Sequence, residues 1–204
     1  MQPFILVVDD KEDACRSICA TLRDAGFQPI PVENVQEAVA HLARARNSEN
    51  LEQRYSVAVI DLHFENAENV PNQETAGLIV LKEAIKDEFL EPIILTGRGS
   101  EEAASQALEL GAYRYIQKGK RIGGKDDLDR LVVAVKQAIE LRANMINLSR
   151  QIRELRDTIA PLRAAGALKE DLLTFLSGAL FDTDQIYRHI LHTRGKATAV
   201  VPGI

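Results

Sequence analysis

Four short apolar runs, each followed directly by polar residues, dominate the hydrophobic pattern of the first 120 residues. The runs are rich in β-branched residues and four or five positions long, which is typical of strands buried on both faces of a parallel sheet. They occupy residues 4–8, 57–60, 92–95 and 113–117. The polar residues that follow them are, in order, Asp9 with Asp10, Asp61, Thr96 and Lys118. Because parallel strands end on one edge of their sheet, we expect these side chains to lie close together.

Amphipathic segments alternate with these runs, as in βαβ units joined by right-handed crossovers. Apolar positions three and four apart predict helices over about residues 11–25, 35–46, 74–88 and 101–110. A further strand, Phe27 to Val32, contains two prolines, Pro29 and Pro31, which suit an edge position. The predicted fold class is therefore α/β: a flavodoxin-like, doubly wound, five-stranded parallel sheet of order 2-1-3-4-5, with a long C-terminal helix and a small all-α extension.

Length and composition fit this fold, because 204 residues with 46% hydrophobic content can form one medium-sized domain with an appendage. The net charge of −5 gives no general attraction for nucleic acid or an anionic membrane surface. No stretch approaches the roughly 18 apolar residues of a transmembrane helix, and the N-terminus has no charged signal region, so we expect a cytoplasmic protein. Cys15 and Cys19 are expected to be buried thiols in a reducing compartment, since no further ligand completes a metal set.

The polar residues at the strand ends suggest phosphoryl chemistry. Carboxylates as close together as Asp9, Asp10 and Asp61 repel one another, and a hard divalent cation such as Mg²⁺ would relieve that repulsion. Asp61 could then attack a phosphoryl group whose oxygens are neutralised by the metal, the Thr96 hydroxyl and the Lys118 ammonium. The expected product is an acyl phosphate.

The order of acidic pair, single acid, threonine and lysine at strand ends resembles the CheY-like receiver domains of two-component response regulators. The resemblance implies that Asp61 is the phosphoacceptor and that Lys118 contacts the phosphate. It also implies that Mg²⁺ is held by Asp9, Asp10, Asp61 and the backbone carbonyl of His63. Such a protein is a signalling phosphoacceptor rather than an enzyme, and its partner is a histidine kinase or a phosphotransfer protein.

The same resemblance assigns roles to four side chains. Thr96 and Tyr115 match the switch hydroxyl and the switch aromatic residue, which rearrange on phosphorylation. His63 and Arg98 lie two positions after the phosphoacceptor and the threonine, where family members tune the lifetime of the phosphate. Two other interpretations stay open: a doubly wound domain with merely solvated carboxylates, and a receiver scaffold that no longer takes phosphate.

The sequence departs from the family's pattern in two loops. Receivers usually place a proline and a glycine shortly after the phosphoacceptor, whereas this chain has an enlarged loop over residues 62–73 and reaches a glycine only at Gly77. After Lys118 the family commonly has a proline, but this chain has Gly119 and a basic, glycine-rich loop up to residue 124. The second departure leaves the placement of Lys118 less well specified by the sequence.

Apolar residues with a repeat of 3.5 follow the expected receiver domain, which is the period of a left-handed coiled coil. They are Leu131, Ala134, Ala138, Leu141, Met145, Leu148, Ile152, Leu155, Ile159 and Leu162. A helix over residues 125–160 would be about 54 Å long, more than the roughly 30 Å of a small domain. We therefore expect a homodimer through residues 131–162. The alternative is an intramolecular hairpin, in which Pro161 and Gly166 break the helix and later helices fold back; both together would form a four-helix bundle.

The predicted organisation has three parts: a receiver domain over residues 1–124, a coiled-coil extension over 125–162 and a helical segment with a flexible tail over 163–204. The first hypothesis for function is a phosphorylation-gated switch whose extension acts on dimer geometry and a downstream protein effector. The second is a transcriptional regulator that binds DNA through its C-terminal helices, although their balanced charge does not favour it. The sequence also fits a fragment of a larger protein.

Overall fold

The computed structural model describes residues 2–65, 76–119 and 125–164 of the chain. The enlarged loop beyond residue 65, the basic loop over 120–124 and the predicted segment beyond residue 164 lie outside the described residues. Two compact units are distinguished, the first containing residues 1–142 and the second beginning at Ala143.

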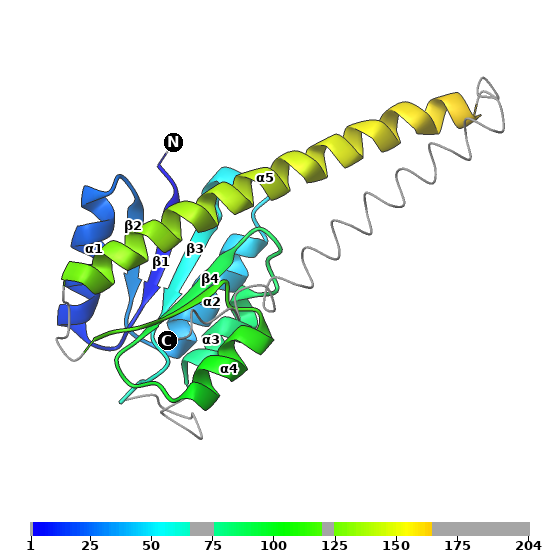
Figure 1. Ribbon diagram of the computed structural model, residues 1–204. Coiled ribbons are helices and arrows are strands. Elements are labelled where there is room, and N and C mark those ends of the chain that lie inside the picture. Colours follow the sequence, from blue (N-terminus) through cyan, green and yellow to red (C-terminus); the bar gives the residue numbers. More distant parts are fainter. Residues whose placement is uncertain (1, 66–75, 120–124, 165–204) are drawn as a thin grey trace, which may run out of the picture. The chain divides into compact units, whose positions relative to one another are not determined.

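A five-stranded, entirely parallel sheet forms the centre of the first unit (Figure 1). Its strands are β1 (Phe4–Val8), β2 (Gln28–Val32), β3 (Tyr55–Ile60), β4 (Glu91–Thr96) and β5 (Arg114–Gln117). The strand order is β2-β1-β3-β4-β5. This confirms the predicted flavodoxin-like topology, including the edge position of the strand that contains Pro29 and Pro31.

Helices connect the strands, and their ends follow local capping chemistry. They are α1 (Glu12–Asp24), α2 (Val35–Arg46), α3 (Gly77–Ala84), α4 (Glu101–Leu110) and α5 (Lys125–Ala164), with a short 3₁₀ helix, η1 (Leu51–Gln53). Asn34 and Ser100 cap α2 and α4, because their side chains accept hydrogen bonds from backbone N–H groups three residues on. Gly111 ends α4 in the left-handed region, at φ 112°.

The structure corrects two predicted helix ends. Helix α3 ends at Ala84 rather than at Glu88, because the Asp87 carboxylate accepts the Phe89 N–H at 3.0 Å and so favours a turn over a further helical turn. Helix α5 runs through Pro161 to Ala164 instead of breaking at the proline.

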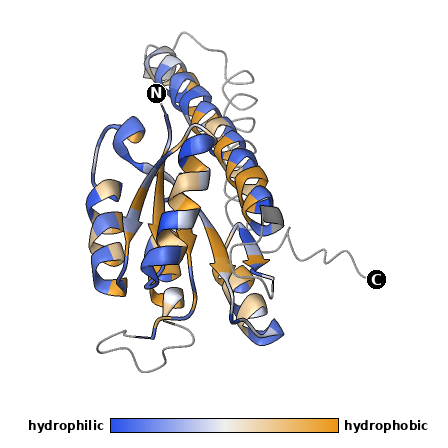
Figure 2. Cartoon of the chain, turned by 90° about the vertical axis from the view of Figure 1, so that its left-hand side faces the viewer, coloured by the Kyte–Doolittle hydropathy of each residue, from blue (hydrophilic) through white to orange (hydrophobic). Residues whose placement is uncertain are grey.

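The two faces of the sheet bury separate hydrophobic clusters, because side chains alternate along each strand. In β1, Ile5 and Val7 join one cluster, whereas Leu6 and Val8 join the other. Helices α1 and α5 cover the first face, and α2, α3 and α4 cover the second. Figure 2 shows the resulting hydrophobic strands between helices with hydrophilic outer faces. The carboxyl ends of the strands are thereby held together by a fully packed core.

Leu131, Ala134 and Ala138, the first positions of the 3.5-residue repeat, belong to this core and are fully buried. These positions of the predicted seam therefore pack against the sheet. Cys15 and Cys19 are free and buried, as expected. Within the described residues, no helix combines the length and the apolar character needed to cross a membrane.

Candidate functional site

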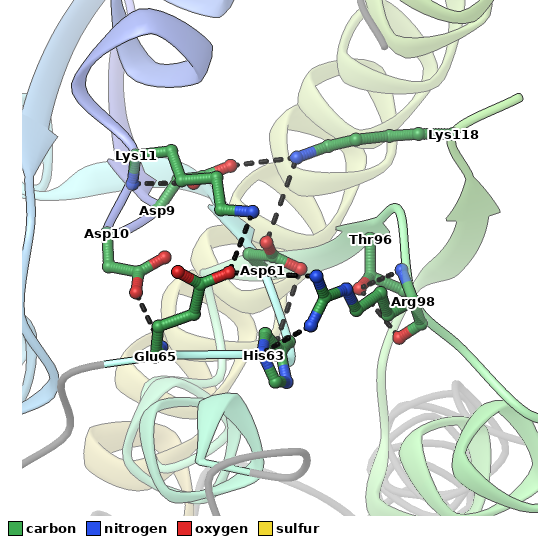
Figure 3. Close-up of polar contacts among 9 residues, drawn as sticks. All are labelled: Asp9, Asp10, Lys11, Asp61, His63, Glu65, Thr96, Arg98 and Lys118. Carbon is green, nitrogen blue, oxygen red and sulfur yellow. Dashed lines mark hydrogen bonds and ion pairs between the residues drawn. The ribbon is translucent and has the colours of Figure 1, made fainter. Parts of the chain in front are cut away.

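The carboxyl ends of β1, β3, β4 and β5 bring together four of the predicted site residues (Figure 3). The Lys118 Nζ lies 2.8 Å from Asp9 Oδ2 and 3.8 Å from Asp61 Oδ2. Thr96, at the end of β4, is fully buried beside them. The Lys118 side chain is only 11% exposed, so its charge is held where water screens it poorly. An ammonium thus joins two carboxylates that are 109 and 57 residues away in sequence.

Asp61 is held in place by its backbone. Its N–H donates to the Val8 carbonyl at 2.8 Å, which extends the pairing of β3 with β1 by one residue. Gly77 packs so closely that a Cβ there would overlap the Asp61 carbonyl oxygen. This contact explains why the chain has a glycine at the start of α3, because any side chain would push Asp61 away from the sheet edge.

The pKa of the Asp61 carboxyl is raised above its ordinary value. Burial is the largest cause and the nearby Asp9 charge adds to it, while Lys118, the Thr96 hydroxyl and the His63 N–H act in the opposite direction. The His63 N–H lies 3.5 Å from Asp61 Oδ1, which is a long contact. Asp61 is therefore a carboxylate whose charge is poorly solvated and which gains from a further cation nearby.

The two carboxylate oxygens of Asp10 have different surroundings. Its Oδ2 accepts the Glu65 N–H at 2.6 Å, while its Oδ1 is buried and has no hydrogen-bond partner among the described residues. Within those residues, no three acidic, histidine or cysteine side chains are already gathered as a metal set. The donors nevertheless fit a hard cation, because a buried carboxylate oxygen without a donor is the group that such an ion satisfies.

The hydroxyls of the predicted switch residues, Thr96 and Tyr115, differ in their hydrogen bonding. The Thr96 hydroxyl donates to the Arg98 carbonyl at 3.1 Å. The Tyr115 hydroxyl is buried without a hydrogen-bond partner in the described part of the chain, and a Cβ at Gly99 would overlap it. Burial, followed by the Asp61 charge, raises the pKa of the Tyr115 phenol. The ring of Tyr115 is thus seated against a backbone that only glycine can provide.

Four side chains, Lys11, Glu65, Arg98 and His63, form a polar network along the rim of the site, which we call the rim network (Figure 3). Glu65 Oε1 lies 3.2 Å from Lys11 Nζ and 3.8 Å from Arg98 Nη2. Arg98 Nη1 lies 3.2 Å from His63 Nε2. Lys11 is the main cause that lowers the pKa of the exposed Glu65 carboxyl.

Sequence reasoning missed Lys11 and Glu65. Lys11 directly follows the acidic pair, and its position there was the available signal. Glu65 lies at the beginning of the enlarged loop, where no periodicity marks a residue. Its neighbour Phe64 and the nearby Leu62 are buried, which fixes the start of the loop and so the position of Glu65.

Sequence comparison finds relatives among bacterial regulators, although no family model matches the chain. The chain is 33% identical over 139 residues to an NtrX-like response regulator of Rickettsia bellii, covering 67% of this chain and 25% of that protein. It is 28% identical over 164 residues to the nitrogen assimilation regulatory protein NtrX of Azorhizobium caulinodans, covering 79% and 31%. The chain thus spans about a quarter to a third of these relatives.

Solved structures show the same fold. A response regulator receiver domain from Clostridium thermocellum superposes with a TM-score of 0.55 at 23% identity, covering 69% of this chain and 97% of that one. NtrX from Brucella abortus, in complex with ADP, superposes with a TM-score of 0.54 at 25% identity, covering 76% and 29%. The described fold is thus that of a response regulator receiver domain.

Proposed function

The chain carries a receiver domain of the CheY-like response-regulator family, and from this premise we propose that Asp61 accepts a phosphoryl group. The observation that carries the proposal is the position of the Lys118 ammonium, which contacts the carboxylates of both Asp9 and Asp61. Receiver domains are phosphoacceptor signalling proteins rather than classical enzymes. We propose a histidine kinase or a phosphotransfer protein as the donor, which would place the reaction in the cytoplasm.

Asp9, Asp10, Asp61 and the backbone carbonyl of His63 would hold Mg²⁺, which receiver domains generally bind at the phosphorylation site. When bound, the ion would supply positive charge to the phosphoryl oxygens. The unpartnered Oδ1 of Asp10 supports this ligand set, because that oxygen is buried and already desolvated. Its other oxygen, Oδ2, would keep the Glu65 N–H.

In the transfer step, an ionised Asp61 oxygen attacks phosphorus as the bond from phosphorus to the donor's imidazole nitrogen breaks. The electron pair of that bond stays on the released imidazole, and the product is the Asp61 acyl phosphate. Lys118 keeps Asp61 ionised despite its burial and offers an N–H to the phosphoryl oxygens. The Thr96 hydroxyl would leave the Arg98 carbonyl to bind the phosphate, and Tyr115 would follow as the switch residue.

The rim network would set how long the phosphate survives. Arg98 and His63 lie across the rim of the Asp61 site, and Glu65 links Arg98 to Lys11. A side-chain network in that place hinders water on its way to the acyl phosphate. We propose that it lengthens the lifetime of the phosphate, with His63 and Arg98 as the residues that contribute most.

A small-donor experiment tests the phosphoacceptor. The protein with Mg²⁺ and acetyl phosphate is expected to gain the mass of one phosphoryl group, and Asp61→Asn is expected to lose that gain while keeping its fold by circular dichroism. Asp129→Asn, at an exposed position of α5, serves as the matched control and should label normally. Labelling that persists in Asp61→Asn would place the acceptor elsewhere.

The helical extension is the proposed output. Among the seam positions after Ala138, Met145 and Ile152 are buried within the single chain, whereas Leu155 is 49% exposed. We propose a homodimer through the part of this seam around Leu155, acting on a downstream protein effector. The alternative, DNA binding by helices beyond residue 164, lies outside the described residues, and nothing in the described part favours it.

A further inference from the structure

The backbone of Gly119, the residue after Lys118, is tied to the first turn of α5. Its N–H donates to Asp127 Oδ2 at 2.7 Å. A proline at this position would have no N–H to donate, so the contact requires a residue other than proline here. Asp127 is the third residue of α5, where a carboxylate is favoured by the positive end of the helix dipole.

This hydrogen bond completes a pair of backbone contacts around Lys118. The Lys118 N–H donates to the Thr96 carbonyl at 2.8 Å, which is the last contact of β5 with β4. The next N–H along the chain, that of Gly119, has left the sheet and is fixed by Asp127 instead. The backbone on both sides of the lysine is thus fixed, one side by a strand and the other by a helix.

The Asp127 carboxylate is largely shielded from water, which strengthens its hydrogen bond to the Gly119 N–H. The Asp127 side chain is only 13% exposed, and Arg130 approaches its other oxygen at 4.0 Å. Asp127 and Lys118 line the same cavity, of about 230 Å³, together with Asp13 and Leu128. A charge-assisted hydrogen bond sheltered from water is stronger than a neutral one, so it can restrain a glycine that would otherwise sample many conformations.

We propose that Asp127 is a positioning residue for Lys118: by holding the Gly119 N–H, it keeps the lysine ammonium between Asp9 and Asp61. The inference rests on the proposed phosphoacceptor function and assigns a residue outside the strand ends to it. Asp127 does not touch the phosphoryl group. It affects phosphorylation only indirectly, by fixing the orientation of Lys118 at the end of β5.

The kinetics of phosphorylation by acetyl phosphate with Mg²⁺ test this role. Asp127→Ala is expected to lower the rate at saturating donor by about tenfold, as for loss of one hydrogen bond to a charged group. Asp127→Asn, whose side-chain oxygen can still accept, should recover most of that rate. Asp129→Ala removes the same charge from an exposed position two residues on and should leave the rate unchanged.

A double variant distinguishes a positioning role of Asp127 from a general loss of structure. In a Lys118→Ala background, Asp127→Ala should change the remaining rate by less than about twofold, because its effect passes through the lysine. An undiminished tenfold loss in that background would overturn the proposal. So would an Asp127→Ala rate equal to that of the unchanged protein.

An NMR measurement tests whether Asp127 positions Lys118 even if the protein accepts no phosphate. In Asp127→Ala, the Gly119 amide should lose hydrogen-exchange protection, and the Lys118 side-chain nitrogen resonance should move toward that of a solvated lysine. Failure of the unchanged protein to label would count against Asp61 as acceptor, whereas an unmoved Lys118 resonance would count against Asp127.

Discussion

Asp61 holds a charge that its chemistry needs and that its burial disfavours. Because burial raises its folded-state pKa above the ordinary 3.8, the native state binds more protons than the unfolded state between those two pKa values. The free energy of unfolding therefore decreases as pH rises through that window, and the penalty persists at neutral pH. Below about 3.8 it disappears.

Asp61→Asn should accordingly raise the free energy of unfolding at pH 7, and its advantage over the unchanged protein should shrink as the pH falls toward 3.8. Urea unfolding at a series of pH values measures the difference. Asp129→Asn, in which an exposed carboxylate is neutralised, should show no such pH-dependent gain. A variant less stable than the parent at pH 7 would contradict a penalty from burial.

Gly99 leaves room for the Tyr115 hydroxyl. In Gly99→Ala the new methyl would overlap the Tyr115 hydroxyl and displace a rigid ring, at a cost of about 1–3 kcal/mol for overpacking. The Tyr115 pKa, which burial now raises, should return toward 10.0, as measured by NMR titration of labelled tyrosine. Gly97→Ala is the control, because a Cβ there meets only the Lys118 side chain, at 3.8 Å. An unchanged Tyr115 titration in Gly99→Ala would show that the ring does not depend on this glycine.

The sequence predicted correctly that polar side chains at the ends of parallel strands lie close together. Asp9, Asp61, Thr96 and Lys118 come together because each follows a buried parallel strand. Glu65 and Asp127 could not be found in this way. Their contacts run from a loop to Asp10, 55 residues away, and from a helix turn to a backbone N–H, and neither leaves a periodic pattern.

At the scale of elements, Arg142 fixes α5 to the loops that precede β3 and β4. Its guanidinium donates from Nε to the Phe89 carbonyl at 2.8 Å and from Nη2 to the Leu51 carbonyl at 2.7 Å. Burial lowers the pKa of this arginine. Its planar guanidinium donates to both carbonyls at once, which a lysine ammonium does not reproduce.

Arg142→Ala should therefore lower the free energy of unfolding by about 2 kcal/mol, because two carbonyls lose their donors at once. Arg142→Lys should recover only part of the loss, since one ammonium does not reproduce the guanidinium fork. Lys136→Ala, at an exposed position of the same helix, is the control and should stay within about 0.5 kcal/mol of the parent. Chemical denaturation gives all three values, and equal stability of Arg142→Ala and Lys136→Ala would refute the role.

Element boundaries were less predictable than element identity. Periodicity predicted the five α-helices and five strands of the described residues, but the end of α3 depends on an Asp87 side chain that accepts the Phe89 N–H. For α5 the sequence pattern was ambiguous, because one 3.5-residue repeat serves two purposes. Its first positions pack on the sheet, and of the later ones Met145 and Ile152 are buried while Leu155 is exposed. Only packing separates these two uses.

At the scale of the whole molecule, the exposed seam raises the question of assembly. Leu148 is half-buried and Leu155 exposed, and apolar side chains repeated along one helix face favour association. Leu148→Lys with Leu155→Lys places two charges on that face and should convert a dimer into a monomer in sedimentation velocity, because a buried ammonium without a partner opposes association.

The matched control adds the same two charges away from the seam. Ala143→Lys with Asn147→Lys changes exposed positions of the same helix and should leave the dimer intact. Phosphorylation should proceed in both double variants, because the site at Asp61 depends on strand ends and not on residues after Ala138. A dimer that survives lysines at 148 and 155 would exclude the seam and move the assembly surface to another part of the chain.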